Sequence, residues 1–88
     1  MNPSDFLRGL CDVPERFSAF TVRVGFSHPG NESDETEFCI ERQNVEELDE
    51  LFGTFCNENG FENVEVLYVD VVLMALTMDE LVRTEEQM

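Results

Sequence analysis

The sequence predicts a small α+β domain, with an antiparallel sheet of about three strands packed against helices in the order α-β-β-α-β-α. Three observations indicate this class. Two segments of alternating apolar residues flank a His-Pro-Gly-Asn turn signal, an amphipathic helical pattern follows them, and a second apolar stretch comes after that helix. A chain of 88 residues has room for one domain, which we expect to span residues 1–88.

The first two strands are expected to form an antiparallel hairpin. Alternation from Phe17 to Ser27 is typical of a half-buried strand, and it resumes from Thr36 to Arg42. Residues 31–35 between them are mostly acidic, so we expect an acidic tip. Arg23 and Arg42 lie one on each strand and are expected to bridge acidic side chains across the pair. The residues predicted to face the core are Phe20, Val22, Val24, Phe26, Phe38 and Ile40, whereas Glu37, Cys39 and Glu41 are predicted to face outward.

Two helices are predicted from their start and stop signals. Pro3-Ser4-Asp5 opens a short N-terminal helix with Ser4 at the N-cap, and Pro14 ends it. Residues 44–47 have the form of a capping box with Asn44 at the N-cap, and Asn59-Gly60 ends this second helix. Between these signals, apolar residues at i, i+3, i+4, i+7 and i+8 predict one buried face, formed by Leu48, Leu51, Phe52, Phe55 and Cys56.

The most apolar stretch, residues 64–76, leaves two interpretations open. Alternation at its start predicts a strand to about Val69. The apolar residues after Asp70 also fit a helical face, so we favour a helix that starts between Asp70 and Thr77. Alternatively, the strand continues and a helix starts at Thr77, where residues 77–80 repeat the capping-box pattern.

The charge of the chain excludes several functions. The chain has twenty acidic residues, five arginines and no lysine, which gives a formal net charge of −15. Phosphate contacts need clustered Lys and Arg, so we expect neither direct nucleic-acid binding nor binding to anionic membranes. No apolar run approaches the ~18 residues of a membrane span, and no export signal opens the chain, so a cytoplasmic protein is expected. Three cysteines without a C-x-x-C motif indicate reduced thiols: Cys11, Cys39 and Cys56.

No catalytic or metal-binding residue is predicted. His28 is the only histidine, it stands before a Pro-Gly turn, and no cysteine is near it in the sequence. We therefore expect an exposed turn histidine rather than a zinc ligand or a general base. The acidic tip lacks the central glycine and alternating ligands of an EF-hand, and the chain has no glycine-rich phosphate loop. We expect a protein that is not an enzyme and that uses no cofactor or metal.

The acidic side chains are the strongest functional signal. In the helix after Asn44, the residues Glu46, Asp49 and Glu50 share the face opposite the apolar stripe, and that helix contains no Lys or Arg. A like-charge pair one turn apart, such as Glu46 and Glu50, destabilises a helix by about 0.2–0.5 kcal/mol, so folding alone does not explain this face. We expect an anionic surface that mimics nucleic-acid phosphates and binds a basic protein groove through Glu32, Asp34, Glu35, Glu37, Glu41, Glu46, Asp49 and Glu50.

In these features the chain resembles the small acidic anti-CRISPR proteins encoded by phages, such as the Cas9 inhibitors of Listeria prophages. The resemblance is carried by Met1-Asn2 followed by Asp5-x-x-Arg8, and by the acidic hairpin and the helix at 44–56 in the same order. It implies an inhibitor that binds Cas9 or a Cascade subunit in an infected or lysogenic bacterial host and blocks the basic groove for the PAM duplex. The stretch at 64–76 departs from the resemblance because it is far more apolar.

Three other interpretations stay open. An acidic immunity protein or antitoxin would cover a basic nuclease toxin with the same face, and Tyr68 or Phe61, if exposed, would be its apolar anchor. An acid excess without lysine also occurs in proteins adapted to high intracellular salt, although eight phenylalanines and three cysteines are many for such a core. Surplus apolar surface from Val69 to Met78 would instead support a homodimer, so the sequence is compatible with a monomer or a homodimer.

Overall fold

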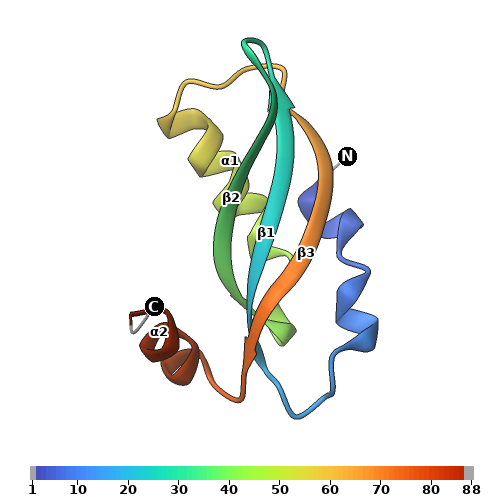
Figure 1. The fold of residues 1–88 in the computed structure, drawn as a ribbon, viewed down its shortest axis with the longest axis vertical. Coiled ribbons are helices and arrows are strands. Elements are labelled where there is room, and N and C mark those ends of the chain that lie inside the picture. Colours follow the sequence, from blue (N-terminus) through green and yellow to red (C-terminus); the bar gives the residue numbers. More distant parts are fainter. Residues whose placement is uncertain (1, 87–88) are drawn as a thin grey trace.

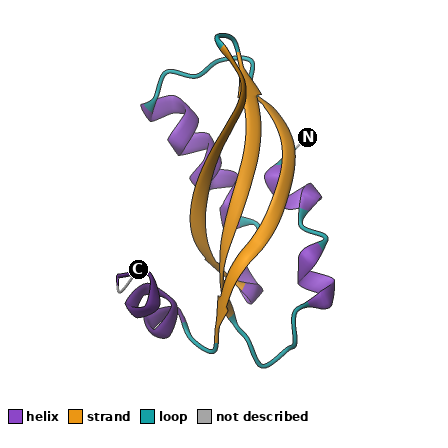
Figure 2. Ribbon diagram, viewed as in Figure 1, coloured by secondary structure: helices purple, strands orange, loops and turns teal. Residues whose placement is uncertain are grey.

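The computed structural model describes residues 2–86 as a three-stranded sheet with helices (Figure 1, Figure 2). The predicted fold class and element order are confirmed, and the expected N-terminal helix consists of two short 3-10 helices. No helix in this part of the chain is long and apolar enough to span a bilayer. The elements are η1 (Pro3–Phe6), η2 (Gly9–Asp12), β1 (Ala19–His28), β2 (Asn31–Glu41), η3 (Arg42–Asn44), α1 (Glu47–Glu58), β3 (Glu65–Ala75) and α2 (Met78–Glu86).

β1 is the central strand of the sheet, and both neighbours run antiparallel to it in the order β2-β1-β3. Residues directly opposite one another share a face, so the pairs Phe20–Ile40 and Val22–Phe38 place these four side chains together, as predicted. This core face packs against α1, which crosses behind the sheet in Figure 1. We call the opposite face the outer face.

Residues 31–35 are part of a strand, which corrects the expected acidic tip. β2 begins at Asn31 opposite His28, so Pro29 and Gly30 alone connect the two strands. Gly30 has a φ of +100°, and a proline followed by a residue with positive φ is the arrangement of a type II turn. The hairpin is therefore longer and tighter than predicted, and its acidic residues extend along an edge strand.

The main core lies between the sheet and α1 and is rich in phenylalanine. Phe26 of β1 and Leu48 of α1 are fully buried. The rings of Phe26 and Phe52 meet edge to face with 5.4 Å between centroids, a geometry worth about 0.5–1.5 kcal/mol beyond the burial itself. The helix that carries the candidate surface is therefore held on the sheet by aromatic contacts.

The C-terminal segment follows the alternative interpretation, and the favoured one is wrong. β3 continues past Val69 to Ala75, and α2 begins at Met78. The backbone N–H of Glu80 donates to Thr77 Oγ1 (3.2 Å), so the second capping pattern does mark a helix start. Two register shifts between β1 and β3 break the period of two that identifies a strand, which explains why the sequence pattern was ambiguous.

α2 covers one end of the outer face. Leu81 is fully buried against the first residue of β1 and the last residue of β3. Glu85 accepts hydrogen bonds from Thr21 Oγ1 (2.6 Å) and Cys39 Sγ (3.0 Å). The hydrogen bond from Thr21, and after it the one from Cys39, lowers the pKa of Glu85. Burial and the hydrogen bond to Glu85 raise the pKa of the Cys39 thiol. A charged carboxylate therefore helps to hold α2 on the sheet.

The N-terminal helix starts two residues earlier than predicted. Asn2, rather than Ser4, is the N-cap of η1, and its backbone N–H donates to Asp5 Oδ2 (3.0 Å). Ser4 instead contacts α1, because its backbone N–H and its hydroxyl donate to the two carboxylate oxygens of Asp49 (2.9 and 2.7 Å). This pair of hydrogen bonds fastens η1 to α1.

Arg42 orders the connection between η2 and β1, and within residues 2–86 it bridges no acidic side chain, contrary to the prediction. Its guanidinium donates to the carbonyl oxygens of Val13 (3.1 Å), Pro14 (2.8 Å) and Phe17 (3.1 Å). The same group lies 5.1 Å from the centroid of the Phe20 ring, within cation–π range. One arginine thus satisfies three carbonyl groups of a segment that has few other backbone partners.

Candidate acidic interaction surface

α1 concentrates acidic side chains in its first turn. Because η3 ends at Asn44, that residue is not the N-cap as predicted, and α1 begins at Glu47 after Glu46. Glu47, Asp49 and Glu50 therefore lie where the N-terminal end of the helix dipole stabilises a carboxylate by about 0.3–1 kcal/mol. Part of this charge has a folding role, which the sequence pattern did not indicate.

Asp49 has a structural role in this arrangement. Both of its carboxylate oxygens accept hydrogen bonds from Ser4, and the side chain is half-buried between α1 and η1. The prediction that Asp49 shares a free face with Glu46 and Glu50 is therefore corrected. The other two carboxylates of that face are exposed.

A groove between α1 and β2 combines an apolar floor with an acidic rim. Its volume is about 370 Å³. The rim extends about 16 Å along α1 at ~1.5 Å per residue, and no hydrogen bond or ion pair among residues 2–86 engages its three carboxylates. We call this feature the acidic groove; its floor is formed by the half-buried Phe38, Leu51 and Phe55, and its rim by the exposed Glu47, Glu50, Thr54 and Glu58.

A second depression continues from the acidic groove around the start of α1. It has a volume of about 380 Å³ and is lined by Gln43, Asn44, Glu46, Glu47 and Glu50. Two of these glutamates also line the acidic groove. The two depressions therefore join the exposed carboxylates into one run along the helix: Glu46, Glu47, Glu50 and Glu58.

On the outer face, Arg23 pairs with two of the predicted acidic residues. Its guanidinium donates to Glu37 (3.0 and 2.9 Å) and lies 3.5 Å from Glu35, so the predicted cross-strand bridge is confirmed. The Tyr68 hydroxyl also donates to Glu35. The hydrogen bond to Glu37 raises the pKa of Arg23, and the hydrogen bond to Glu35 raises the pKa of Tyr68. Two carboxylates of β2 are therefore partly compensated within the fold.

The remaining predicted acids follow the β2 edge strand. Asp34 Oδ1 accepts a hydrogen bond from the backbone N–H of Glu35 (2.8 Å), and its Oδ2 lies 3.6 Å from His28 Nε2. Glu32 is exposed and Glu41 is half-buried. The eight predicted residues thus lie on both sides of the β2 edge, with those at the start of α1 on the core side and Glu35 on the outer side.

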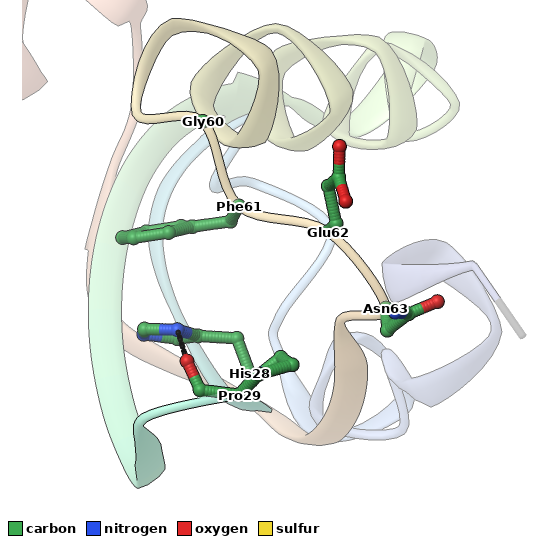
Figure 3. Close-up of a pocket in the computed structure, with 6 residues that line it drawn as sticks. All are labelled: His28, Pro29, Gly60, Phe61, Glu62 and Asn63. Atoms are coloured by element: carbon green, nitrogen blue, oxygen red, sulfur yellow. Dashed lines mark hydrogen bonds between the residues drawn. The ribbon is translucent and has the colours of Figure 1, made fainter.

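His28 is not the exposed turn histidine that was predicted. Its ring stacks on Phe61 with 4.1 Å between centroids, and its Nδ1 lies 3.2 Å from the carbonyl oxygen of Pro29 (Figure 3). The Nε2 atom is buried and has no hydrogen-bond partner in the described part of the chain. Phe61 also packs on the core phenylalanines Phe26 and Phe55, so it is part of the aromatic packing rather than an exposed anchor.

The pocket beside His28 joins the hairpin turn to the loop after α1. It has a volume of about 310 Å³. In Figure 3, the His28 and Phe61 rings lie parallel, one from each of these two segments. The lining residues are His28, Pro29, Gly60, Phe61, Glu62 and Asn63.

Sequence reasoning missed the acidic groove. Glu47 was assigned to a capping box, and Phe55 was assigned to the core. A signal was present, because Glu47, Leu51, Thr54 and Glu58 follow a helical spacing at the border of the apolar stripe. The groove itself depends on Phe38 of β2, whose position beside α1 is a tertiary contact that no local pattern reports.

Within residues 2–86, no group of three or more His, Cys, Asp or Glu side chains is arranged to hold a metal ion. The three cysteines are free, with Cys11 exposed and Cys39 and Cys56 half-buried. Burial raises the pKa of the Cys56 thiol. No protein-family model matches the chain, and comparisons with curated proteins and with solved structures found no match.

Proposed function

We propose that this protein is an inhibitor that mimics nucleic acid. Its carboxylates occupy the basic groove of a nucleic-acid-binding protein, with guide-loaded Cas9 or a Cascade subunit as the candidate partner, and they exclude the DNA duplex from that groove. The observation that carries the proposal is the acidic groove, whose exposed carboxylates have no cationic partner in the described chain, on a protein of net charge −15 without lysine.

The chemistry of the acidic groove fits arginine side chains of a partner. The aliphatic part of an arginine would lie on the floor at Phe38 and Leu51, and its guanidinium would face the rim carboxylates. A guanidinium over a phenylalanine ring gains a further ~0.5–1 kcal/mol at an exposed site. Proteins that read a PAM duplex present arginines in a positively charged channel, which is the complementary arrangement.

Repulsion within the surface supports a cationic partner. Glu46 and Glu50 are one turn apart, and Glu47 lines both depressions with Glu50. A basic partner relieves this repulsion, and the charges steer association at a rate that falls as salt screens them. Binding is therefore expected to be fast and strongly dependent on ionic strength.

Competition with DNA tests the proposal. The full chain is titrated into guide-loaded Cas9 and into Cascade, each holding a fluorescent duplex with its PAM, and release of the duplex is followed by anisotropy. We expect the chain to displace the duplex from one of the two effectors, with an affinity that falls steeply as salt rises. If neither effector releases its duplex at low salt, the proposed target class is wrong.

A variant of the acidic groove locates the contact. Neutralising its rim by Glu47→Gln, Glu50→Gln and Glu58→Gln changes the net charge from −15 to −12, by three charges. We expect displacement to weaken at least about tenfold, equivalent to ~1.4 kcal/mol. Far-UV circular dichroism checks that α1 stays folded, because Glu47 and Glu50 also interact with the helix dipole.

A matched control separates the groove from the overall charge. Asp12→Asn, Glu15→Gln and Glu86→Gln change the net charge by the same three charges at exposed positions outside the groove. This control is expected to bind within about threefold of the wild-type chain, ~0.6 kcal/mol. Equal losses in both triple variants would show that the groove has no special role.

The apolar floor of the acidic groove favours a second candidate, an acidic immunity protein or antitoxin that covers the active site of a basic nuclease. Tight inhibitors of this kind rely on buried aromatic contacts, which Phe38 and Phe55 would supply. The two candidates differ in what is inhibited. In the second, the chain abolishes cleavage by the nuclease toxin and leaves DNA bound to the CRISPR effectors.

A further inference from the structure

α2 packs on the sheet through an apolar cluster of its own. Leu81 is the one side chain of this helix that is buried in the described part of the chain. The cluster shares no residue with the main core between the sheet and α1. Departure of α2 from the sheet would therefore leave the main core intact. The cluster consists of Ala19, Ala75 and Leu81, with Cys39, Leu73 and Met78 packed against it.

The connection between β3 and α2 has the form of a hinge. The chain bends at Leu76 and Thr77, which are both exposed, and α2 stands beside the strands after this bend (Figure 1). The Ser18 hydroxyl donates to the carbonyl oxygen of Leu76 and so fixes the chain at the end of β3. Within residues 2–86, no backbone hydrogen bond joins α2 to the sheet. The helix can therefore move about residues 76–77 without breaking a strand pair.

The polar contacts between α2 and the sheet meet at one carboxylate. Glu85 accepts the hydrogen bonds from Thr21 and Cys39 on the outer face, and Thr21 is only 1% exposed beneath the helix. α2 carries three further carboxylates and one arginine, and β2 places Glu37 and Glu41 on either side of Cys39. Like charges on the two elements oppose docking. A segment with one buried apolar side chain and such repulsion is expected to open at a low free-energy cost.

We propose that α2 is a hinged lid, which opens as a unit about residues 76–77 while the sheet and α1 stay folded, and which controls access to the Cys39 thiol. An isolated helix of nine residues is too short to persist in water, so α2 also loses its helical hydrogen bonds when it opens. Opening removes the Glu85 contact and uncovers Thr21 and Cys39. The lid shares no residue with the acidic groove, so this proposal and the proposed function can fail independently.

The lid sets the reactivity of Cys39. While α2 is in place, burial and then the hydrogen bond to Glu85 raise the pKa of this thiol. The thiolate is the form that attacks disulfides, so the closed lid suppresses that reaction. Opening removes the Glu85 contact and part of the burial, and the pKa of Cys39 returns toward its ordinary value. Cys56 is an internal comparison, because its thiol packs against the main core and not under α2.

Amide hydrogen exchange of the full wild-type chain, followed by NMR, tests the opening without any substitution. We expect the amides of α2 to share one opening equilibrium and to exchange at least about tenfold faster, relative to their intrinsic rates, than the most protected amides of β1. Low urea should change the exchange of α2 little, because opening exposes little surface. If the α2 amides are as protected as those of β1, the helix leaves the sheet only in global unfolding and the proposal is wrong.

Reaction with dithiodipyridine, a neutral aromatic disulfide, tests the link to Cys39. The Cys39 thiol gives up its proton and attacks one sulfur of the reagent, a mixed disulfide forms, and the released pyridinethiol takes up the proton. Two chains are compared in a Cys11→Ser background: Cys56→Ser leaves Cys39 as the one thiol, and Cys39→Ser leaves Cys56. Leu81→Ala is expected to accelerate the reaction of Cys39 at least about tenfold and that of Cys56 less than about twofold.

Val82→Ala is the matched control. It shortens the neighbouring aliphatic side chain of the same helix, but Val82 is 43% exposed whereas Leu81 is fully buried. We expect this substitution to change both thiol rates less than about twofold. Equal acceleration of Cys39 and Cys56 by Leu81→Ala would show that the whole chain opens, and an unchanged rate at Cys39 would show that α2 does not control the thiol. Either result would overturn the proposal.

Discussion

Substitution of Gly25 by alanine is expected to destabilise the protein because the ring of Tyr68 lies directly over that residue. A Cβ atom at position 25 would be 2.1 Å from Tyr68 Cε1 and 2.3 Å from Cζ. Ordinary contact between carbon atoms needs ~3.5–4.0 Å, so the ring has to withdraw by roughly 1.4 Å or more. That movement breaks the hydrogen bond from the Tyr68 hydroxyl to Glu35.

The expected magnitude follows from three contributions. Overpacking costs typically 1–3 kcal/mol, with the lower end expected here because the half-buried ring can swing toward solvent. Loss of the hydrogen bond costs about 1 kcal/mol. Replacement of a strand glycine by alanine gains about 0.5–1 kcal/mol of backbone entropy. The net loss of unfolding free energy is about 1–2 kcal/mol.

Gly53→Ala is the matched control. Gly53 lies inside α1, and a Cβ there has no heavy atom within 4 Å. The same chemical change is therefore expected to stabilise the protein by about 1 kcal/mol through helix propensity. Urea denaturation measures both variants, and Tyr68, the only tyrosine in a chain without tryptophan, reports its own environment by near-UV circular dichroism.

The sign of the Gly25→Ala effect depends on Tyr68. In a Tyr68→Ala background the clash is absent, so Gly25→Ala is expected to become neutral or stabilising. In the single variant, the pKa of Tyr68 should fall back toward its usual value near ~10, because the hydrogen bond to Glu35 that raises it is lost. If Gly25→Ala stabilises the wild-type chain as Gly53→Ala does, the ring does not lie over Gly25 and the reasoning is refuted.

Three further predictions concern contacts that hold the helices and loops. Arg42→Ala removes three charged hydrogen bonds to carbonyl groups and should cost about 2–3 kcal/mol in urea denaturation, with Arg42→Lys restoring only part. Ser4→Ala should cost about 1–2 kcal/mol and increase amide exchange in η1, because the hydroxyl bond to Asp49 is lost. The lowered pKa of Glu85 means that its contribution is complete above the unfolded value of ~4.3 and disappears as the pH falls through the folded value. Glu85→Gln should therefore reduce the loss of stability on acidification, and an unchanged acid titration would contradict that linkage.

The hairpin was predictable because its signals are local and agree with one another. Phe20 and Val22 alternate with polar residues along β1, Phe38 and Ile40 do so in the second half of β2, and Pro29-Gly30 has the residue types of a type II turn. Burial on one face keeps the strand register from slipping. The fold class could therefore be derived from the sequence alone.

The end of β3 and the position of Arg42 could not be derived in this way. Register shifts in β3 remove the period of two, and Val71, Met74 and Ala75 also fit the spacing of one helical face. Arg42 binds carbonyl groups of a loop that lies more than twenty residues away in the sequence. Both features arise from tertiary contacts that override the local pattern.

The candidate surface was predictable only in part, because the charge follows from the composition whereas the contacts of each carboxylate are tertiary. An acidic surface without lysine is visible in the composition, and Glu46 and Glu50 are exposed as expected. The role of Asp49 depends on Ser4, and the acidic groove depends on Phe38 of β2. Charge could be read from the sequence, but the division between structural and free carboxylates needed the structure.

The salt dependence of partner binding tests the central claim most directly. The dissociation constant of the complex with the effector or nuclease that binds the chain is measured at several salt concentrations for the wild-type chain, the acidic-groove triple variant and the control triple variant. The account predicts a clearly shallower dependence on salt for the groove variant, with the control variant parallel to the wild-type chain. Equal slopes for all three proteins would contradict it, because the carboxylates of the acidic groove would then take no part in the contact.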